Sequence, residues 1–515
     1  MKRLRVVVIG AGAGGLAAAV DLARNGADVT VLERAASPGG KMRQVVVDGH
    51  GIDAGPTVFT MRWIFEGLFR DSGADLSSAL TLTPAVVLAR HAWTTGGTLD
   101  LFADITRSAD AIGAFAGAKD ASGYLAFCKR ARDIYRTLQG SFISMERPAS
   151  ALDLTMRVGF GHLDQLWRTA PMKTLWGALG DYFTDPRLRQ LFGRYATYVG
   201  SSPLSAPATL MLIAHVEQDG VWLVDGGMRA VADAIKDLAE RNGARFRFGC
   251  HVAEIVSGRG GVTAVKLDDG DVLACDAVVF NGDAAALAKG LLGRNVSGAA
   301  PDVPQTHRSL SAVTWCLHAK TRGFPLSHHT VFFAEDYPSE FDTVFRKRQV
   351  PARPTVYVCA QDRGALEVSE NLERERLLVL INAPADGDIA DVACGDEATA
   401  LWQAARSVFA TAGLQVEAPD TRAVLTAPEH FNTLFPGNGG ALYGRANHSA
   451  FESFARPGAV SSVPGLYLAG GSVHPGAGVP MATMSGRIAA ARVIDDWSHS
   501  RAGTSRRGPI RIPTP

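Results

Sequence analysis

Residues 4–33 read LRVVVIGAGAGGLAAAVDLARNGADVTVLE, and they contain the most informative pattern in the chain. A β-branched apolar run, typical of a buried parallel strand, leads directly into Gly10, Gly12 and Gly15 in GxGxxG spacing. A helical pattern follows, and a second apolar run ends at an acid, Glu33. Strand, glycine turn, helix, strand and acid in this order predict the opening of a dinucleotide-binding fold.

The residue types in this pattern suit a diphosphate and a ribose. Gly10 permits a tight turn, Gly12 lets main-chain NH groups approach a pyrophosphate, and Gly15 lets the helix pack closely on the strand. The helix N-terminus adds partial positive charge, and the Glu33 carboxylate can accept both ribose hydroxyls. A lone GxGxxG is weak evidence in a chain with 55 glycines, so the prediction depends on the ordered context.

The next segment favours a flavin over a nicotinamide. Arg34 and Pro38-Gly39-Gly40-Lys41 follow the acid at once, where a nicotinamide enzyme would normally continue with a third strand and helix. A second glycine pair with a basic residue matches the flavoprotein pattern. Asp53-Ala54-Gly55-Pro56-Thr57 is a further loop that exposes main chain, although an ordinary turn has the same composition. We therefore expect FAD as the cofactor.

Length and composition bound the remaining possibilities. With 515 residues, of which 47% are hydrophobic and 20% charged, the chain can bury a large core in roughly two to four domains. Lys plus Arg is 52 and Asp plus Glu is 51, so no nucleic-acid partner is expected. The six cysteines are far apart and form no CxxC pair, which predicts neither a metal site nor a disulfide framework and fits a reducing cytosol.

The order of patterns predicts an α/β fold: a Rossmann-like FAD-binding domain with an inserted mixed-sheet substrate domain and a helical subdomain that is a candidate for membrane contact. The predicted parts are residues 1–75, 225–290 and 425–500 for the FAD-binding domain, 76–107 and 290–425 for the substrate-covering sheet, 108–224 for the helical subdomain, and 501–515 for a basic, disordered tail.

Strand patterns support this division. Alternating apolar runs at 311–317, 355–359 and 377–382 predict strands of the substrate-covering sheet. In the FAD-binding domain, a helix over 228–241 precedes three predicted strands, at 245–256, 262–267 and 272–280.

No membrane-spanning helix is expected, since the longest uncharged stretch, 457–486, contains four prolines and seven glycines. Residues 152–179 combine apolar and basic side chains. They suit either a basic amphipathic surface on a bilayer or a core helix with a polar outer face. The side chains concerned are Phe160, Leu163, Leu166, Trp167, Leu175 and Trp176, with Arg157, Arg168 and Lys173.

A second glycine-rich turn between a strand and a helix lies near the far end of the chain. The apolar residues 466–469 lead into Gly470 to Gly478, and Pro480 can begin a helix that extends to about residue 497. The dipole of this helix could stabilise negative charge on a reduced flavin ring. His474, inside the turn, is either a proton carrier or a residue that holds the loop.

Several motifs occur together along nearly the whole chain. They are Gly10 to Gly15, Glu33, Gly39-Gly40-Lys41, Asp53 to Thr57, Tyr182-Phe183-Thr184-Asp185-Pro186-Arg187-Leu188, Tyr198-Val199-Gly200-Ser201-Ser202-Pro203, Val221-Trp222 before Gly226-Gly227-Met228, and His474-Pro475-Gly476-Ala477-Gly478. This set resembles bacterial carotenoid desaturases of the phytoene desaturase type, whose flavin fold is shared with monoamine oxidases. The segments that flank the HPGAG loop, Gly470 to Val473 and Val479-Pro480-Met481, look like the hydroxyneurosporene desaturase subfamily (also called methoxyneurosporene dehydrogenases).

The resemblance implies FAD-dependent oxidation of a long apolar 1-hydroxycarotenoid at C3 and C4, with hydride transfer to the flavin. It implies peripheral association with a membrane lipid surface on the cytoplasmic side, and it leaves the electron acceptor unknown. The expected FAD contacts are Gly10, Gly12, Gly14, Gly15, Glu33, Arg34, Gly40, Lys41, Gly55, Pro56, Thr57, Val252, Gly471, Gly478, Val479 and Met481. His474 and Arg62 are the candidate catalytic residues, and His474 is the candidate partner of the substrate hydroxyl.

Other functions fit the same fold. A phytoene desaturase or another flavin oxidoreductase of the amine oxidase type is the first alternative, although an amine oxidase normally has a cysteine or an aromatic cage near the flavin. A non-redox escort protein that cradles lipid groups is the alternative from another class. Both glycine loops and Glu33 argue against an escort protein.

Overall fold

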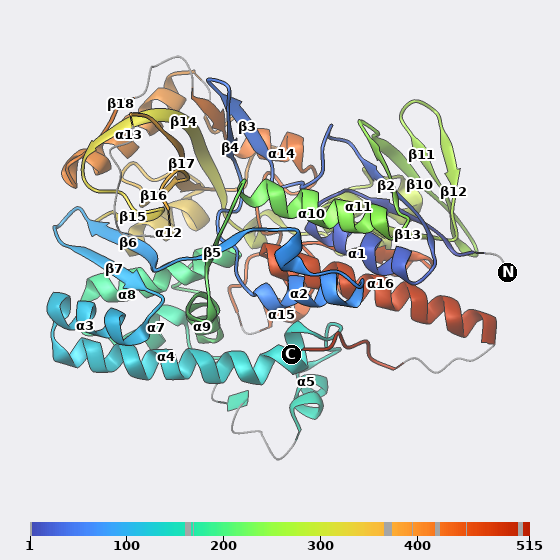
Figure 1. Cartoon of the computed structure of the whole chain (residues 1–515), viewed down its shortest axis with the longest axis horizontal. Helices are drawn as coiled ribbons and strands as arrows, with labels where there is room; N and C mark the ends of the chain where they lie inside the picture. The colour runs from blue at the N-terminus through green and yellow to red at the C-terminus, as the bar shows by residue number, and fades with distance from the viewer. Residues whose placement is uncertain are drawn as a thin grey trace.

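The computed structural model describes residues 3–159, 166, 167, 169–364, 373–393, 395–417, 423–449, 451–502 and 508–514. The chain forms two halves (Figure 1): one is built on a five-stranded sheet, and in the other an eight-stranded sheet lies above a group of helices. Helix α1 (Ala13–Arg24) packs against α16 (Val479–Ala502), so both ends of the chain build the first half.

The five-stranded sheet is the predicted dinucleotide-binding element. Its order is β20 (Leu466–Leu468), β13 (Ala277–Phe280), β1 (Arg5–Ile9), β2 (Asp28–Glu33) and β9 (Arg245–Phe248), and all neighbouring pairs are parallel. The side chains of β1 are buried on both faces, as its continuous apolar run predicts.

Two layers cover the two faces of this sheet. Val6 and Val8 of β1 face α1, α16 and α10 (Met228–Arg241), whereas Val7 and Ile9 face a three-stranded antiparallel meander. The meander consists of β10 (Val252–Gly258), β11 (Gly261–Leu267) and β12 (Val272–Ala274). Two of the predicted strands are therefore wrong in extent, because 245–256 and 272–280 each divide between the parallel sheet and the meander.

Close helix contacts explain two of the glycines. A Cβ atom at Gly15 would lie 2.0 Å from the carbonyl oxygen of Gly10, and one at Gly486 would lie 1.9 Å from that of Gly14. The first glycine lets α1 follow β1 directly, and the second lets α16 cross α1 at its first turn. The N-terminus of α1 is thereby held against the C-terminal helix.

The eight-stranded sheet is mixed. Its order is β18 (Leu414–Glu417), β14 (Ser311–Gly323), β17 (Glu375–Ala383), β16 (Val356–Ala360), β15 (His329–Phe333), β6 (Val87–Trp93) and β7 (Thr98–Phe102), with β19 (Val424–Thr426) also paired to β14. Only the β15–β6 pair is parallel among these described strands. Helix α13 (Gly395–Thr411) packs against this sheet, and the strands predicted near 311, 355 and 377 are confirmed.

The helical group lies below that sheet in Figure 1. There the long helix α4 (Ala118–Leu138) runs horizontally, and α5 (Ala151–Val158) lies below it. Asp185 caps α8 by accepting from the Arg187 NH group, and Pro186 occupies the first helical position. The group comprises α3 (Ile105–Ala116), α4 (Ala118–Leu138), the π-helical turn η2 (Gln139–Ile143), α5 (Ala151–Val158), α7 (Leu175–Leu179), α8 (Pro186–Gly193), η4 (Arg194–Val199), η5 (Ala208–Met211) and α9 (Leu212–Asp219).

Short elements complete the chain. They are β3 (Gln44–Val47), β4 (His50–Asp53), α2 (Arg62–Asp71), η1 (Leu76–Ser78), β5 (Leu82–Pro84), β8 (Trp222–Val224), α11 (Ala284–Ala288), η6 (Arg294–Ala299), η7 (Gln305–His307), α12 (Tyr337–Asp342), η8 (Thr343–Lys347), α14 (Pro428–Leu434) and α15 (Glu452–Ala455). Within the described residues, no helix combines the length and the hydropathy that crossing a bilayer requires.

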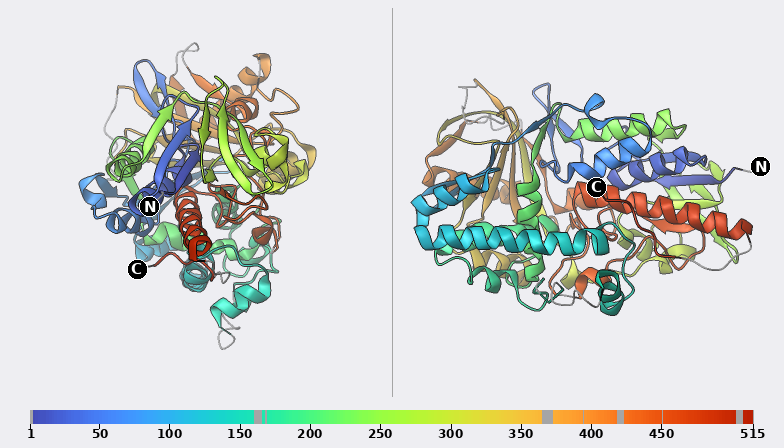
Figure 2. Two further views of the ribbon diagram at one scale, coloured as in Figure 1. Left: turned by 90° about the vertical axis from the view of Figure 1, so that its right-hand side faces the viewer. Right: turned by 60° about the horizontal axis from the view of Figure 1, so that its bottom comes forward.

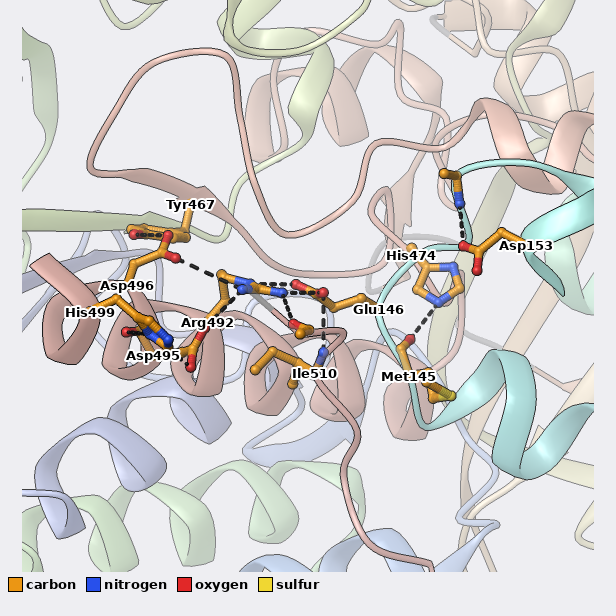
Figure 3. A network of polar contacts seen from close by, with 12 residues as sticks. Met145, Glu146, Asp153, Tyr467, His474, Arg492, Asp495, Asp496, His499 and Ile510 are labelled. Atoms are coloured by element: carbon orange, nitrogen blue, oxygen red, sulfur yellow. Dashed lines mark hydrogen bonds and ion pairs between the residues drawn. The ribbon is translucent and has the colours of Figure 1, made fainter. Parts of the chain in front are cut away.

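The prediction of a disordered tail is wrong for residues 508–514. Ile510 exchanges hydrogen bonds with Glu146: its NH group donates to Glu146 Oε2 at 3.2 Å, and its carbonyl accepts from the Glu146 NH group at 3.0 Å. Ile512 is buried in the core of the first half. Arg492 of α16 bonds Glu146 and the carbonyl of Gly508, as Figure 3 shows for Glu146. The contacts of Ile510 and Ile512, together with the ion pair between Arg492 and Glu146, thus order this segment despite its basic, proline-rich composition.

Candidate active site

A cavity of 1240 Å³ reaches from the glycine loops of the first half into the space between the eight-stranded sheet and the helices. It exceeds the roughly 300–1,000 Å³ of a typical small-molecule pocket, so it can hold a cofactor and a long second ligand. Gly10, Glu33, Asn281 and Gly470 line one end. These residues lie at the carboxyl ends of parallel strands, where open α/β sheets bind ligands.

The first turn of α1 forms the core of that end. Gly12 is the N-cap residue and offers no side-chain hydrogen bond, so the first NH groups of the helix have no side-chain cap. The Gly39 NH group donates to the Ala11 carbonyl at 2.8 Å, and Gly12 and Gly39 form a parallel bridge. A Cβ atom at Gly40 would lie 3.2 Å from the Gly12 Cα atom. The two glycine segments therefore meet beside the positive end of a helix, as a diphosphate requires.

Glu33 ends β2 and lines the cavity. Its Oε2 atom accepts from the Ala11 NH group at 2.7 Å, and its Oε1 atom accepts from the Ala35 NH group at 2.8 Å. A carboxylate can accept about four hydrogen bonds, so two lone-pair positions are left for ribose hydroxyls. The main chain thus orients this carboxylate before any ligand binds.

The loop after β4 is held by the buried carboxylate of Asp53. Burial raises the pKa of Asp53, although hydrogen bonds from the Met228 NH group at 2.5 Å and the Gln44 amide at 3.0 Å oppose this effect. Through Met228 the loop is tied to the start of α10. A Cβ atom at Gly55 would lie 1.8 Å from the Lys41 carbonyl. The loop is therefore packed against the second glycine segment, and its Gly55, Pro56 and Thr57 line the cavity.

Arg34 and Lys41 line the cavity, and both side chains donate hydrogen bonds to protein carbonyls. Arg34 Nη2 donates to Thr433 and Leu434, and Lys41 Nζ donates to Leu442 at 2.6 Å. Burial lowers the pKa of Lys41. Both side chains thus tie the segment 433–442 to the cofactor end of the cavity.

Two cavity-lining residues were missed by the sequence reasoning. Asn281 follows β13, and its Nδ2 atom donates to the Gly10 carbonyl at 3.2 Å. Arg456 is buried, which lowers its pKa to about 10, and it donates from Nη1 to the Gly471 carbonyl at 2.9 Å. The Asn-Gly-Asp sequence directly after the strand 277–280 is a signal that could have found Asn281. Arg456 follows no such pattern.

His474 holds a loop rather than facing the cavity. It is buried, and its Nε2 atom lies 3.0 Å from the Phe142 carbonyl and 2.9 Å from that of Met145, so Nε2 carries a proton that both carbonyls accept. Figure 3 shows the contact with Met145. Burial lowers its pKa to about 4. His474 is not a cavity-lining residue. These contacts favour the loop-holding alternative over the expected roles as proton carrier and hydroxyl partner.

Arg62 is also misplaced for catalysis. It begins α2, where its Nε atom bonds Glu66 Oε1 at 2.8 Å and its guanidinium lies 5.8 Å from the centre of the Trp222 ring. Arg62 does not line the cavity. Its side chain forms an ion pair on the surface of α2, so the structure places Arg62 outside the candidate site and gives no support to the expected catalytic role.

The remaining predicted residues come together as one site. Every expected FAD contact except Gly15 lines the cavity, and Gly15 instead allows α1 to pack against β1. The uncapped helix turn, the carboxylate at the end of β2 and the close glycine segments fit the diphosphate and ribose of FAD.

One group with the composition of a metal site lies in the eight-stranded sheet. Ligand atoms of His328, His329 and Cys359 lie within 4.8 Å of one another. The Nδ1 atoms of both histidines are engaged, with the Arg363 carbonyl at 2.7 Å and the Tyr357 hydroxyl at 2.8 Å. Burial raises the pKa of the Cys359 thiol, which disfavours the thiolate that a metal would bind.

Comparison with known proteins identifies relatives over nearly the whole chain. Hydroxyneurosporene desaturase of Rubrivivax gelatinosus is 51% identical over 506 residues, which cover 97% of this chain and 96% of that protein. Hydroxyneurosporene desaturase of Cereibacter sphaeroides is 41% identical over 494 residues, covering 96% and 98%. The solved structure of an oxidoreductase from Methanosarcina mazei superposes with a TM-score of 0.60 at 15% identity, covering 94% and 99%, and so shows a shared fold.

The family comparison agrees with the geometry of the site. The flavin containing amine oxidoreductase family matches residues 13–494, which include Gly39 and Gly40, the C-terminal glycine-rich turn and the sheet that covers the cavity. The predicted α/β class and its Rossmann-like domain are confirmed. The chain therefore belongs to the flavin containing amine oxidoreductase family, and its cofactor is FAD.

Proposed function

We propose that the protein is an FAD-dependent carotenoid desaturase that introduces a C3–C4 double bond into 1-hydroxycarotenoids such as 1-hydroxyneurosporene. The observation that carries the proposal is the 51% identity to a hydroxyneurosporene desaturase over 97% of the chain. The cavity adds support, because it continues from the FAD residues into an apolar passage between sheet and helices. Leu88, Leu138, Leu210, Ile213, Val331 and Leu378 line that passage.

The reaction removes a hydride from one carbon and a proton from its neighbour. Bound FAD supplies the hydride acceptor. The chain must align the two carbons, exclude water and orient the polyene. Positive charge that develops on hydride loss is delocalised along the conjugated polyene. An enclosed apolar passage meets these requirements better than a pocket built around a strong base.

The alternatives predict different substrates. A phytoene desaturase would accept a carotenoid without a hydroxyl group, and an amine oxidase would accept an amine. An escort protein would bind lipid without oxidising it. The similarity to hydroxyneurosporene desaturases supports none of these three.

The test is an assay of the purified, FAD-loaded protein with hydroxylated and plain carotenoids of equal chain length. We expect oxidised flavin absorption bands, bleaching of these bands on anaerobic addition of the 1-hydroxycarotenoid, and a product with one additional conjugated double bond. Bleaching by an amine or by phytoene alone would favour an alternative. Protein without flavin bands that retains carotenoid would favour the escort function.

We also propose that the protein takes its substrate from a membrane surface on the cytoplasmic side. Helix α5 protrudes from the body of the molecule in Figure 1 and in the left view of Figure 2. On α5 and the segment that follows it, Leu152, Met156, Trp167 and Met172 are 54% to 76% exposed. Trp167 and Met172 also line the cavity, as do Leu154 and Leu166. An exposed apolar surface at a cavity mouth suits the transfer of an apolar polyene from lipid.

Not every apolar side chain between residues 152 and 179 is exposed on this proposed surface. Leu175 is fully buried, and Trp176 lies under the Arg189 guanidinium at 5.0 Å, so neither side chain belongs to the exposed surface. Arg157 pairs with Asp153, and Lys173 pairs with Asp181. Phe160, Leu163 and Arg168 lie outside the described residues. Since the described basic groups are paired with acids, the proposed contact depends on apolar burial rather than on attraction to anionic lipid.

A further inference from the structure

The helical wall of the cavity contains a buried charged cluster. Arg194, the first residue of η4, is 8% exposed, and Glu217 of α9 is 7% exposed. Arg194 Nη1 donates to the Tyr198 hydroxyl at 2.8 Å, and Tyr198 donates to Glu217 Oε1 at 2.7 Å. The Tyr195 hydroxyl donates to Glu217 Oε2 at 2.7 Å. Both oxygens of this carboxylate are therefore satisfied, and the guanidinium reaches it only through Tyr198.

Arg194 has more donors than partners. A guanidinium carries five NH donors, and among the described residues the Tyr198 hydroxyl is the single acceptor that Arg194 bonds. Its Nε atom is buried without a partner. Burial alone would lower the pKa of Arg194, but Tyr198 and Glu217 outweigh burial and raise it, so the group stays charged. An unpaired buried donor is unfavourable, so this side chain favours a ligand that brings an oxygen acceptor.

Three further polar groups without partners lie on the same cavity. His329 Nε2, Tyr337 Oη and Thr355 Oγ1 have no hydrogen-bond partner within the described part of the chain, and all three residues line the cavity. The positive charge of Arg194 contributes to lowering the pKa of His329 and opposes the rise in the pKa of Tyr337 that burial causes. Arg194, His329 and Tyr337 thus line one cavity and interact electrostatically. The cluster is a polar region in a passage whose neighbouring walls are aliphatic.

A hydrogen-bonded chain connects this region to the FAD loop. The His329 Nδ1 atom lies 2.8 Å from the Tyr357 hydroxyl, which lies 2.7 Å from Thr57 Oγ1. Thr57 belongs to the loop assigned to FAD, so the polar region lies at the flavin end of the passage rather than at the exposed mouth near Trp167. A substrate oxidised at C3 and C4 has the oxygen of its C1 hydroxyl only three or four bonds from the reacting carbons, so that hydroxyl must also lie near the flavin.

We propose that Arg194, oriented by Tyr198 and Glu217, binds the C1 hydroxyl oxygen of the carotenoid and so determines the specificity for hydroxylated substrates. The inference rests on the proposed desaturase function and assigns a residue to its selectivity. A fixed guanidinium can donate to a hydroxyl or to an ether oxygen. A plain hydrocarbon end group would leave these donors unpaired and is rejected for that reason.

The test compares the FAD-loaded native protein with Arg194→Met, which keeps an unbranched side chain, shorter than that of arginine, and removes its donors. The native protein should prefer a 1-hydroxycarotenoid over the plain carotenoid by roughly 10- to 100-fold in kcat/KM. Arg194→Met should lose most of this preference through slower turnover of the hydroxylated substrate alone. Binding to the dithionite-reduced holoenzyme, which cannot accept a hydride, should show the same loss in the quenching of tryptophan fluorescence.

Controls separate the possible failures. Arg189→Met removes a guanidinium that stacks on Trp176 outside the cavity and should keep the native preference. Native-level preference in Arg194→Met would overturn the role of Arg194 while leaving the desaturase function intact. Absence of turnover by the native protein would overturn the function itself. If Arg194→Met does not retain FAD, the same comparison is made with Arg194→Lys, which lacks the planar guanidinium. A reduced preference for the hydroxylated substrate in Arg194→Lys supports the proposal, and a native preference overturns it.

Discussion

Glu33 is the residue whose role follows most directly from its position. The end of β2 places its carboxylate on the cavity, and two main-chain NH groups orient it. The same residue type at a surface position has no such preorganisation. Its contribution is therefore to cofactor affinity rather than to folding.

Replacement of Glu33 by Ala should weaken FAD binding. Each lost hydrogen bond to a charged group is worth about 1.5–3 kcal/mol, so the Kd for FAD should rise by at least tenfold. Titration of the apoprotein with FAD, followed by flavin fluorescence, measures this change. Glu66→Ala, which removes an acid paired with Arg62 outside the cavity, is the control. An unchanged Kd in Glu33→Ala would show that another group binds the ribose.

His474 makes the stability of the protein depend on pH. Its pKa is about 4 in the folded protein against 6.5 in the unfolded chain, because burial disfavours the charged ring. The unfolded chain therefore takes up a proton that the folded protein does not, and this group lowers the free energy of unfolding as pH falls from 6.5 towards 4. Above pH 6.5 its effect is absent. The slope is about 1.4 kcal/mol per pH unit for one such group.

Urea unfolding of native protein and His474→Gln at pH 7.5 and 5 measures this effect. The native protein should lose more stability than the variant between the two pH values, because the variant has no group that titrates at position 474. Other buried histidines act on both proteins alike. Equal losses would show that His474 is protonated in the folded state.

At the scale of elements, the segment 508–514 connects the helical group to α16. It pairs with residues 144–146 and buries Ile512, while Glu146 pairs with Arg492 of α16. The carbonyl of the adjacent Met145 accepts a hydrogen bond from His474. His474 lies inside the glycine-rich turn Gly470 to Gly478, which contributes to the cofactor end of the cavity. Packing of the chain end is thus linked to the shape of the cofactor site.

Ile512→Ala should destabilise the protein. Removing a buried isoleucine side chain costs about 2–5 kcal/mol, and a terminal segment that can relax belongs to the lower end of that range. Thermal unfolding monitored by FAD release should show a lower Tm. Ile389→Ala, at a position that is 65% exposed, should leave Tm unchanged. Equal Tm values for native protein and Ile512→Ala would mean that the segment contributes nothing to stability.

At the scale of the whole molecule, the position of the cavity connects two environments. One end is formed by polar loops of the first half, and the other opens beside the exposed apolar residues after α5. Under the proposed entry from lipid, a substrate would meet the aliphatic walls first and the polar region around Arg194 last. This order suits a molecule with a long apolar chain and one polar end.

Trp167→Ser combined with Met172→Ser should weaken vesicle binding by at least tenfold, because each buried apolar side chain contributes about 1.5–3 kcal/mol. Sedimentation with phosphatidylcholine vesicles measures the binding, and the FAD content of the double variant should equal that of the native protein. Val46→Ser with Ile389→Ser removes equally exposed apolar residues elsewhere and should bind as the native protein does. Strong weakening by 0.5 M salt, or equal binding by both double variants, would contradict apolar docking through this surface.

Local pattern determined a large part of this protein. The unit of β1, α1 and β2, the glycine turns and the helix over 228–241 form within short segments, and their chemistry is visible in residue type and spacing. The types of the FAD residues are visible in the same way, although they come together from both ends of the chain. Apolar periodicity also identified strands of the eight-stranded sheet. It could not show which sheet a strand enters, so 245–256 and 272–280 were each predicted as one strand. An apolar run has the same composition in either sheet. Only its pairing with other strands shows where one strand ends and the next begins.

Long-range packing determined the rest. His474 and Arg62 have residue types suited to catalysis, but burial against the carbonyls of 142 and 145, and pairing on α2, remove them from the cavity. Arg194 and Glu217 are ordinary helix residues in the sequence and become a polar region because η4 and α9 bring them together through Tyr198. The tail became ordered because Ile512 finds a core. The contacts of His474 join residues 332 and 329 positions apart, which no local pattern records. Tyr198 and Glu217 are 19 positions apart in the sequence, but only the packing of η4 against α9 brings their side chains together.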